Sequence, residues 1–201
     1  MSKTTIANLA LSHLGIGKEI SILETEQSTE AKAIRPVFDT CARKVLRDFS
    51  WPFATRFVSL GLLDTPVPGA QWEFAYQYPS DCLNFRKILS DVRNDTPDTV
   101  VPYRIAYGDA GQIILTDKES AVAEYTVYVD DTSRYTPDFE LALSYLIAAM
   151  IAPKVTAGDP AKLGQRALQL YSYEIENAKK NASNEEQREQ APEAEAIRVR
   201  G

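Results

Sequence analysis

The sequence predicts an α+β protein in which helices from both ends of the chain form a bundle around a small, mostly antiparallel inserted β-sheet. Apolar residues follow a helical period near both ends and alternate with polar residues between them. The order is two helices, about five strands and two helices, which differs from the strand–helix alternation of a parallel sheet. The 201 residues fit one composite domain. We divide it into N-terminal helices (1–50), the sheet region (51–132), C-terminal helices (133–182) and a mobile tail (183–201).

The first two helices are predicted over residues 4–14 and 28–49. Gly15 follows the first helix and is typical of a helix C-terminus. On the second helix one stripe carries the apolar residues Ala31, Ile34, Phe38, Cys41, Val45 and Phe49. Pro36 interrupts this pattern, so we expect the helix to be kinked or to begin later.

Strands are predicted over residues 51–62, 84–90, 101–107, 112–116 and 121–129. The last is the clearest, because Ala121, Ala123 and Tyr125 face one way while Glu124 and Thr126 face the other. Turn-forming residues at 94–98 and 108–111 indicate hairpins between the strands.

Two further helices follow. Thr136 is a suitable N-cap, Pro137 suits the first helical position, and the helix is expected to end near Ala152, before Pro153. Asp159 and a following proline begin another helix, which is predicted to fade near residue 181. Residues 183–201 hold five glutamates and three arginines and are predicted to be mobile.

Nine of the 19 aromatic residues lie between Phe49 and Phe85. Because buried rings remove much apolar surface from water, such a concentration indicates architecture or an interface before a catalytic pocket. The rings lie where the N-terminal helices meet the sheet region, so we expect them to hold the two parts at a fixed angle. The predicted structural aromatic cluster comprises Trp51, Phe53, Trp72, Phe74, Tyr76 and Tyr78.

No enzyme signature is recognisable, and we predict no catalytic, metal or cofactor site. The single histidine, His13, has no acid–nucleophile motif nearby, and the aspartates near 91–98 and 130–131 are better explained as turn caps than as metal ligands. Cys41 and Cys82 can form one disulfide, but small buried hydrophobic residues are the stronger interpretation. No apolar run is long enough to span a membrane, and we expect a cytoplasmic product.

The net charge is −6, which argues against a protein whose main task is to grip nucleic acid. It is compatible with a protein that lets DNA pass without binding it. Near the end of the chain, Ile197 and Val199 alternate with Arg198 and Arg200. This segment can add as a strand to a neighbouring subunit or wedge between subunits, and the alternative is a disordered, solubilising terminus.

Taken together, short phrases along nearly the whole chain resemble the phage head-to-tail adaptor family, also called tail tubular protein A. In the N-terminal half these are Asn8-Leu-Ala-Leu-Ser-His-Leu-Gly15, Ile20-Ser-Ile-Leu-Glu24, Val45-Leu-Arg, Trp51-Pro-Phe-Ala54 and the stretch 72–83 with its Tyr-Gln-Tyr-Pro-Ser-Asp-Cys core. In the C-terminal half they are Ile113-Ile-Leu-Thr-Asp117, Glu124-Tyr-Thr-Val-Tyr-Val-Asp130, Pro137-Asp-Phe-Glu-Leu-Ala-Leu143 and Ile151-Ala-Pro-Lys-Val-Thr156.

The resemblance implies a non-enzymatic structural protein of the virion neck, made in the host cytoplasm. Its relatives form a ring, usually of twelve copies, between the portal protein and the next tail or nozzle protein. The helices would pack side by side against the portal, the sheet would face the tail, and DNA would pass through without sequence-specific contacts. The alternative is a small soluble ligand-binding or regulatory domain with an aromatic pocket around Trp51 and Trp72. An enzyme is the third interpretation.

Overall fold

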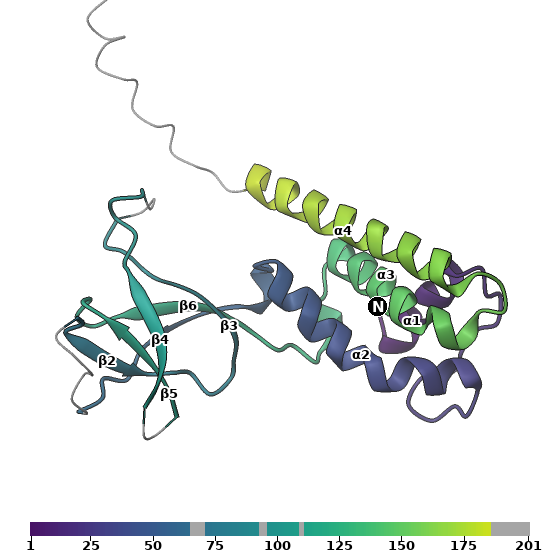
Figure 1. The fold of residues 1–201 in the computed structure, drawn as a ribbon, viewed down its shortest axis with the longest axis horizontal. Coiled ribbons are helices and arrows are strands. Elements are labelled where there is room, and N and C mark those ends of the chain that lie inside the picture. Colours follow the sequence, from purple (N-terminus) through teal and green to yellow (C-terminus); the bar gives the residue numbers. More distant parts are fainter. Residues whose placement is uncertain (65–70, 93–95, 109–110, 186–201) are drawn as a thin grey trace, which may run out of the picture.

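The computed structural model describes residues 1–64, 71–92, 96–108 and 111–185. Within them the chain is α+β, with four α-helices and two three-stranded antiparallel sheets. Figure 1 shows an elongated molecule with the helices at one end and the sheets at the other. The predicted α+β class with a small antiparallel β region is therefore confirmed. Its strands are divided between two sheets.

The first two helices are α1 (Lys3–His13) and α2 (Thr29–Asp48). The Ser28 hydroxyl caps α2 by accepting a hydrogen bond from the Ala31 amide, and Gly15 has a φ of +75°, which suits glycine at a helix exit. The expected late start is wrong, since α2 is assigned as one helix through Pro36. This proline is exposed, so water can reach the carbonyl that it leaves without an amide donor.

Helix α3 (Pro137–Val155) lies at the centre of the helical part and contacts the other three helices. It is followed by α4 (Pro160–Glu185). Both run further than predicted, because α3 continues past Pro153 and α4 continues past residue 181. The Thr156 amide bonds the Ala152 carbonyl at 3.2 Å, so the helix closes after the proline instead of before it.

A glycine allows α3 and α4 to approach closely. A Cβ built on Gly164 of α4 would lie 3.3 Å from the carbonyl oxygen of Ala149 on α3. The start of α3 is where the sequence placed it, with Thr136 as the N-cap residue. Its hydroxyl makes no capping hydrogen bond, however, and it is buried without a partner.

The first sheet has the order β1-β6-β3, with β1 (Thr55–Ser59), β6 (Val122–Val127) and β3 (Cys82–Ile88). The second has the order β2-β5-β4, with β2 (Phe74–Gln77), β5 (Gly111–Thr116) and β4 (Tyr103–Gly108). Strand β2 was not predicted. The predicted strand at 51–62 is shorter, because a 3-10 turn, η1 (Pro52–Ala54), precedes β1. A second 3-10 turn, η2 (Thr132–Arg134), precedes α3.

Residues of both sheets share one apolar core. It contains Leu60 and Tyr125 from the first sheet side and Tyr76 and Ile114 from the second. The chain after β1 links the sheets, because Leu62 forms a bridge with Tyr76 of β2. The predicted turn at 108–111 joins β4 and β5, with residues 109–110 outside the described residues. The predicted turn at 94–98 lies partly outside them, and the tail from 186 onwards lies wholly outside.

No helix among the described residues is long and apolar enough to cross a membrane.

Candidate functional site

The junction between the helices and the sheets is held by a group of aromatic rings. Trp51 is 2% exposed, and its indole nitrogen donates a 2.9 Å hydrogen bond to the Val45 carbonyl in the last turns of α2. The Phe49 and Phe139 rings meet it edge-on, with centroid distances of 4.8 and 5.1 Å. Such edge-to-face pairs add about 0.5–1.5 kcal/mol each beyond area burial. Trp51 thus ties the end of α2 to the start of α3.

Two further rings extend this group towards the sheet. Phe53 packs on Phe139 at 5.1 Å, and Tyr135 packs on Phe139 at 4.5 Å. The Tyr135 hydroxyl donates a 2.7 Å hydrogen bond to the Val129 carbonyl just beyond β6, and burial raises its pKa to about 12. We call the five rings of Phe49, Trp51, Phe53, Tyr135 and Phe139 the joint cluster.

Arg86 of β3 makes the polar part of the joint. Its guanidinium donates hydrogen bonds to the main-chain carbonyls of Phe49 at 2.8 Å, Leu46 at 3.0 Å and Arg47 at 3.3 Å, and to the Thr126 hydroxyl at 2.9 Å. The last carbonyls of a helix have no partner within the helix, so a cation there satisfies them and favours the helix dipole. Burial lowers the Arg86 pKa. A strand residue therefore caps α2 and fixes it to the first sheet.

The second aromatic phrase lies elsewhere. Tyr76 is buried between the sheets and donates a 2.9 Å hydrogen bond to the Lys118 carbonyl, with Phe74 beside it at 6.3 Å. Tyr78 is half-buried and packs at 6.1 Å from Phe85. Trp72 is half-buried against a separate small cluster that includes Leu115.

The structure thus does not bring the six predicted aromatic residues into one cluster. Trp51 and Phe53 belong to the helical core and the other four to the sheets, because β1 carries the chain from the joint towards the far sheet. The three other joint-cluster rings and Arg86 were not in the predicted set. Tyr135 and Phe139 lie far along the sequence, and a lone arginine in a strand gives no local signal.

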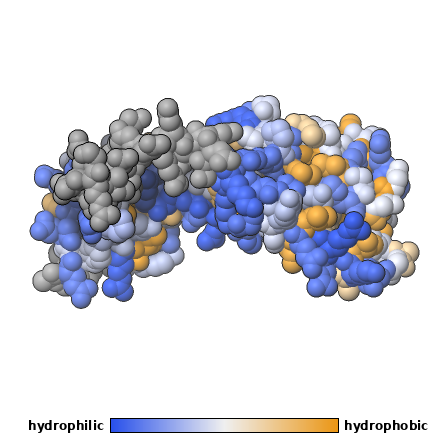
Figure 2. All heavy atoms as spheres, turned by 90° about the horizontal axis from the view of Figure 1, so that it is seen from above, coloured by the Kyte–Doolittle hydropathy of each residue, from blue (hydrophilic) through white to orange (hydrophobic). Residues whose placement is uncertain are grey.

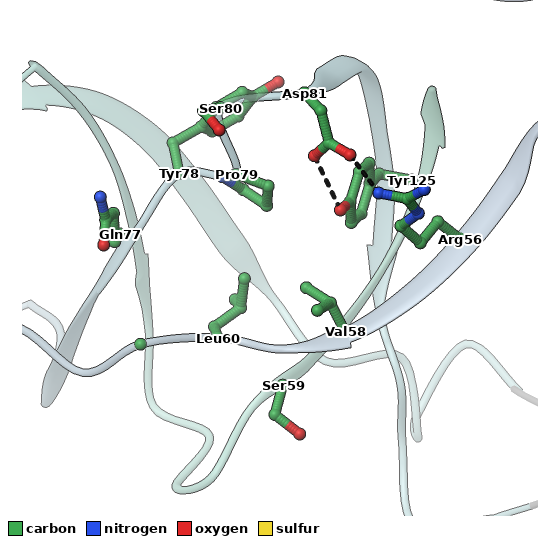
Figure 3. A pocket seen from close by; sticks show the side chains of 11 residues that line it. Arg56, Val58, Ser59, Leu60, Gln77, Tyr78, Pro79, Ser80, Asp81 and Tyr125 are labelled. Carbon is green, nitrogen blue, oxygen red and sulfur yellow. Dashed lines mark hydrogen bonds and ion pairs between the residues drawn. The ribbon is translucent and has the colours of Figure 1, made fainter. Parts of the chain in front are cut away.

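A cleft of about 490 Å³ opens beside β1 (Figure 3). Val58 and Leu60 point into it from β1 and the segment that follows, and Tyr78, Pro79 and Ser80 face them. The Arg56 side chain pairs with Asp81 across one end of the cleft, and the Tyr125 hydroxyl donates a 3.0 Å hydrogen bond to the same carboxylate. These contacts hold segment 78–81 in place opposite β1.

A neighbouring cavity of about 310 Å³ shares Arg56, Ser80 and Asp81 with this cleft. Arg43 of α2 and Tyr128 also line it, and the Arg43 guanidinium lies 4.2 Å from the centroid of the Tyr128 ring. The Tyr128 hydroxyl donates a 3.0 Å hydrogen bond to Asp39 of the same helix. Burial raises the Tyr128 pKa. Neither Trp51 nor Trp72 lines either cavity.

Packing and hydrogen bonds account for the single histidine and the two cysteines. His13 is half-buried at the end of α1, where its Nε2 lies 3.0 Å from the Ser144 hydroxyl and its ring stacks on Tyr145 at 4.0 Å. Burial lowers its pKa. Both cysteines are free, and burial raises the pKa of Cys41 to about 12. The half-buried Cys82 donates a hydrogen bond to the Tyr78 hydroxyl at 3.1 Å.

The aspartates considered as metal ligands have partners of their own. Asp130 binds Lys3 at 2.7 Å, and Asp131 caps η2 through the Ser133 amide at 3.0 Å. Across the described ranges no group of three or more His, Cys, Asp or Glu residues could hold a metal ion. The predicted partner-binding residues Ile197, Arg198, Val199 and Arg200 lie outside the described residues.

Apolar surface is exposed at both ends of the molecule. Figure 2 shows apolar residues gathered over the helical half, where Met150 of α3 and Leu168 of α4 are exposed. On the sheets, Phe57 of β1 and Tyr107 of β4 are exposed. Both ends therefore offer side chains suited to a protein partner.

Neither a scan against models of known protein families nor a search of curated proteins found a match to this chain.

Proposed function

We propose that the protein is a structural virion protein, a head-to-tail adaptor that forms a ring between the portal and the tail and lets the genome through. The observation that carries the proposal is the joint between the helices and the sheets, made by Arg86 and the joint cluster. It joins two differently built ends into one elongated body (Figure 1). The sequence resemblance described above supplies the identity of the two partners.

An adaptor must hold two binding surfaces at a fixed relative position. A flexible linker would allow the two ends of each subunit to reorient, and a ring of such subunits would not present a regular surface to either partner. Here a hydrogen bond from Arg86 connects the end of α2 to β3, and the edge-on contact between Trp51 and Phe139 connects it to α3. Tyr135 adds a third connection, from α3 to the chain after β6. A joint with both polar and aromatic contacts suits that requirement.

The charge of the chain also supports passage of DNA. Each copy carries −6, so a ring of twelve would carry roughly −72. Phosphates bind proteins chiefly through lysine and arginine, and an acidic channel discourages such contacts. In this proposal the helices pack side by side at the portal, with the apolar positions Met150 and Leu168 at subunit contacts, and the sheets face the next tail protein.

The test is assembly with purified portal protein, followed by analytical ultracentrifugation and electron microscopy. We expect a joint complex with a ring of this chain beneath the portal, even if the chain alone is monomeric. Met150→Glu together with Leu168→Glu should weaken the ring, whereas the control Tyr107→Glu, at the sheet end, should leave it intact. Absence of any ring or joint complex would overturn the proposal. A stable monomer whose tryptophan fluorescence is quenched by a small molecule would favour the ligand-binding alternative.

A further inference from the structure

Within the part of the chain that the structure describes, strand β1 has no partner along one main-chain edge. In an antiparallel pair, alternate residues bond the partner strand and the residues between them point the other way. The Leu60 amide bonds the Ala121 carbonyl at 2.9 Å, and the register then places the bonds of Val58 and Arg56 towards β6 as well. The amides and carbonyls of Phe57 and Ser59 therefore point away from the sheet.

The neighbouring strand does not cover this edge. The chain after β1 pairs with β2, through a 2.8 Å bond from the Gln77 amide to the Gly61 carbonyl and another from Leu63 to Ala75. Beyond Gln77 the chain leaves this pairing and turns through segment 78–81. The cleft described above lies where the two segments separate (Figure 3).

The two faces of β1 beside the cleft are both suited to an added strand. Val58 points into the cleft towards segment 78–81, while Phe57 is on the opposite face and is 58% exposed. Natural proteins usually protect an edge with charged residues or a covering segment. On β1 the charged Arg56 is paired with Asp81, so Val58 and Phe57 leave apolar side chains on the two faces of an edge that can accept another strand.

We propose that residues 194–201 of a neighbouring copy bind in this cleft as an additional strand on β1. The inference rests on the proposed ring and names a contact between its subunits. In an extended segment, Ile197 and Val199 share one face and Arg198 and Arg200 the other. The apolar face then packs on Val58 in the cleft.

The arginine face of that segment meets a complementary group. It lies beside Phe57, whose exposed ring can stack with a guanidinium. The alternation of the segment therefore matches both faces of β1.

The segment starts from a suitable place. Helix α4 ends at Glu185, at the end of the helical part that faces the sheets (Figure 1), and Asn181 lies 3.5 Å from Asp138 in the first turn of α3. The eight residues 186–193 extend to at most about 26–29 Å. The proposal therefore requires that β1 of the adjacent copy in the ring lie within this distance of Glu185.

The first test is binding of a fluorescent peptide of residues 190–201 to the full chain carrying Ile197→Asp and Val199→Asp, measured by anisotropy. We expect saturable binding. Ser59→Pro removes an outward amide without removing a bond to β6, so it should weaken binding at least about tenfold, whereas Ser59→Ala should stay within about twofold. Phe57→Lys leaves the main chain intact and should cause a similar loss. No binding up to about 1 mM peptide would overturn the proposal, and so would Ser59→Pro and Phe57→Lys variants that bind the peptide as tightly as the parent protein does.

The second test identifies whose segment binds. Ser59→Cys and Arg198→Cys are placed in separate full-length chains that also carry Cys82→Ser, and the two proteins are mixed with portal and oxidised. A disulfide between the two chains is expected. If the cysteines react only when both are in one chain, the segment folds back on its own subunit and the proposal is overturned. The peptide assay needs no portal, so its outcome is independent of whether the ring itself forms.

Discussion

Replacing Arg86 by methionine tests whether the joint is a rigid part of the fold. Methionine keeps most of the apolar stem but removes every donor of the guanidinium. The carbonyls of Leu46 and Phe49 at the end of α2 then lose the bond from Arg86, as does the Thr126 hydroxyl, while the Arg47 carbonyl keeps a 3.3 Å bond from the Asn84 side chain.

The expected loss follows from the lengths of these bonds. The bonds to Phe49 at 2.8 Å and Leu46 at 3.0 Å are well formed, and hydrogen bonds to a charged group each contribute about 1.5–3 kcal/mol. The cost of burying the guanidinium, which also lowers its pKa, offsets part of this gain. We therefore expect Arg86→Met to lower the free energy of unfolding by about 2–4 kcal/mol. The free energy of unfolding of Arg86→Lys should fall between those of the unmodified protein and Arg86→Met, because a single ammonium group replaces the forked guanidinium donor.

Each half of the molecule can be followed separately in one background, Trp72→Phe. Trp51 is buried in the helical core, whereas Trp72 belongs to a cluster of the sheets, so this change leaves the joint cluster intact. Urea unfolding is measured by Trp51 fluorescence for the helices and by the NMR amide signals of β4 and β5 for the sheets. With Arg86 present, the two transitions should coincide. In Arg86→Met they should separate, since the contacts that couple the two cores are weakened.

The control is Arg104→Met on β4, an exposed arginine whose loss should change stability by less than about 0.5 kcal/mol. If Arg86→Met is as stable as this control, or if its two transitions still coincide, the hydrogen bonds of Arg86 do not hold the joint. The structural basis of the proposed function would then be lost.

Four further outcomes are expected. Trp51→Ala should cost about 3–5 kcal/mol in urea unfolding and the half-buried Trp72→Ala clearly less, so equal costs would contradict the two-core description. Burial lowers the pKa of His13 below its ordinary 6.5, so the folded protein favours the neutral imidazole. The free energy of unfolding should therefore fall as the pH drops below 6.5 and level off below the folded pKa, and His13→Gln should remove this dependence. Gly164→Val should cost about 1–3 kcal/mol by pushing α4 away from α3, with Gly164→Ala less affected; a neutral valine variant would contradict the close approach. Deletion of residues 194–201 should leave the unfolding free energy within about 0.5 kcal/mol while weakening assembly on the portal, and undiminished assembly would refute the role of the tail.

Features that depend on neighbours in the sequence were predictable. The starts of α3 and α4 follow from Pro137 and from Asp159, whose carboxylate caps α4 through the Lys162 amide at 3.1 Å. The alternation of β6 likewise gave its buried face. Thr126 is the exception, since it is buried on the opposite face where it accepts the bond from Arg86.

Features that depend on distant partners were not predictable. The acceptors of Arg86 lie 37–40 residues away along the chain, so its sequence context carries no sign of its role. Pro153 suggested a helix end, but packing of α3 against α4 keeps the helix going. The aromatic phrases were recognised as architectural, yet their division between two cores depends on the path of β1.

The joint and the free edge of β1 impose different requirements on an assembly. A strand from a neighbouring copy would fix the sheets of adjacent subunits to each other, while α3 and α4 provide contacts between their helices. Each subunit would then contact its neighbours both through its sheets and through its helices. If the joint between these two parts were flexible, a subunit could make one set of contacts only by straining or losing the other. The rigidity supplied by Arg86 and the joint cluster would thus make the two sets of contacts cooperative. Under this reasoning, Arg86→Met weakens a ring that has the terminal strand more than it weakens one from which residues 194–201 have been deleted.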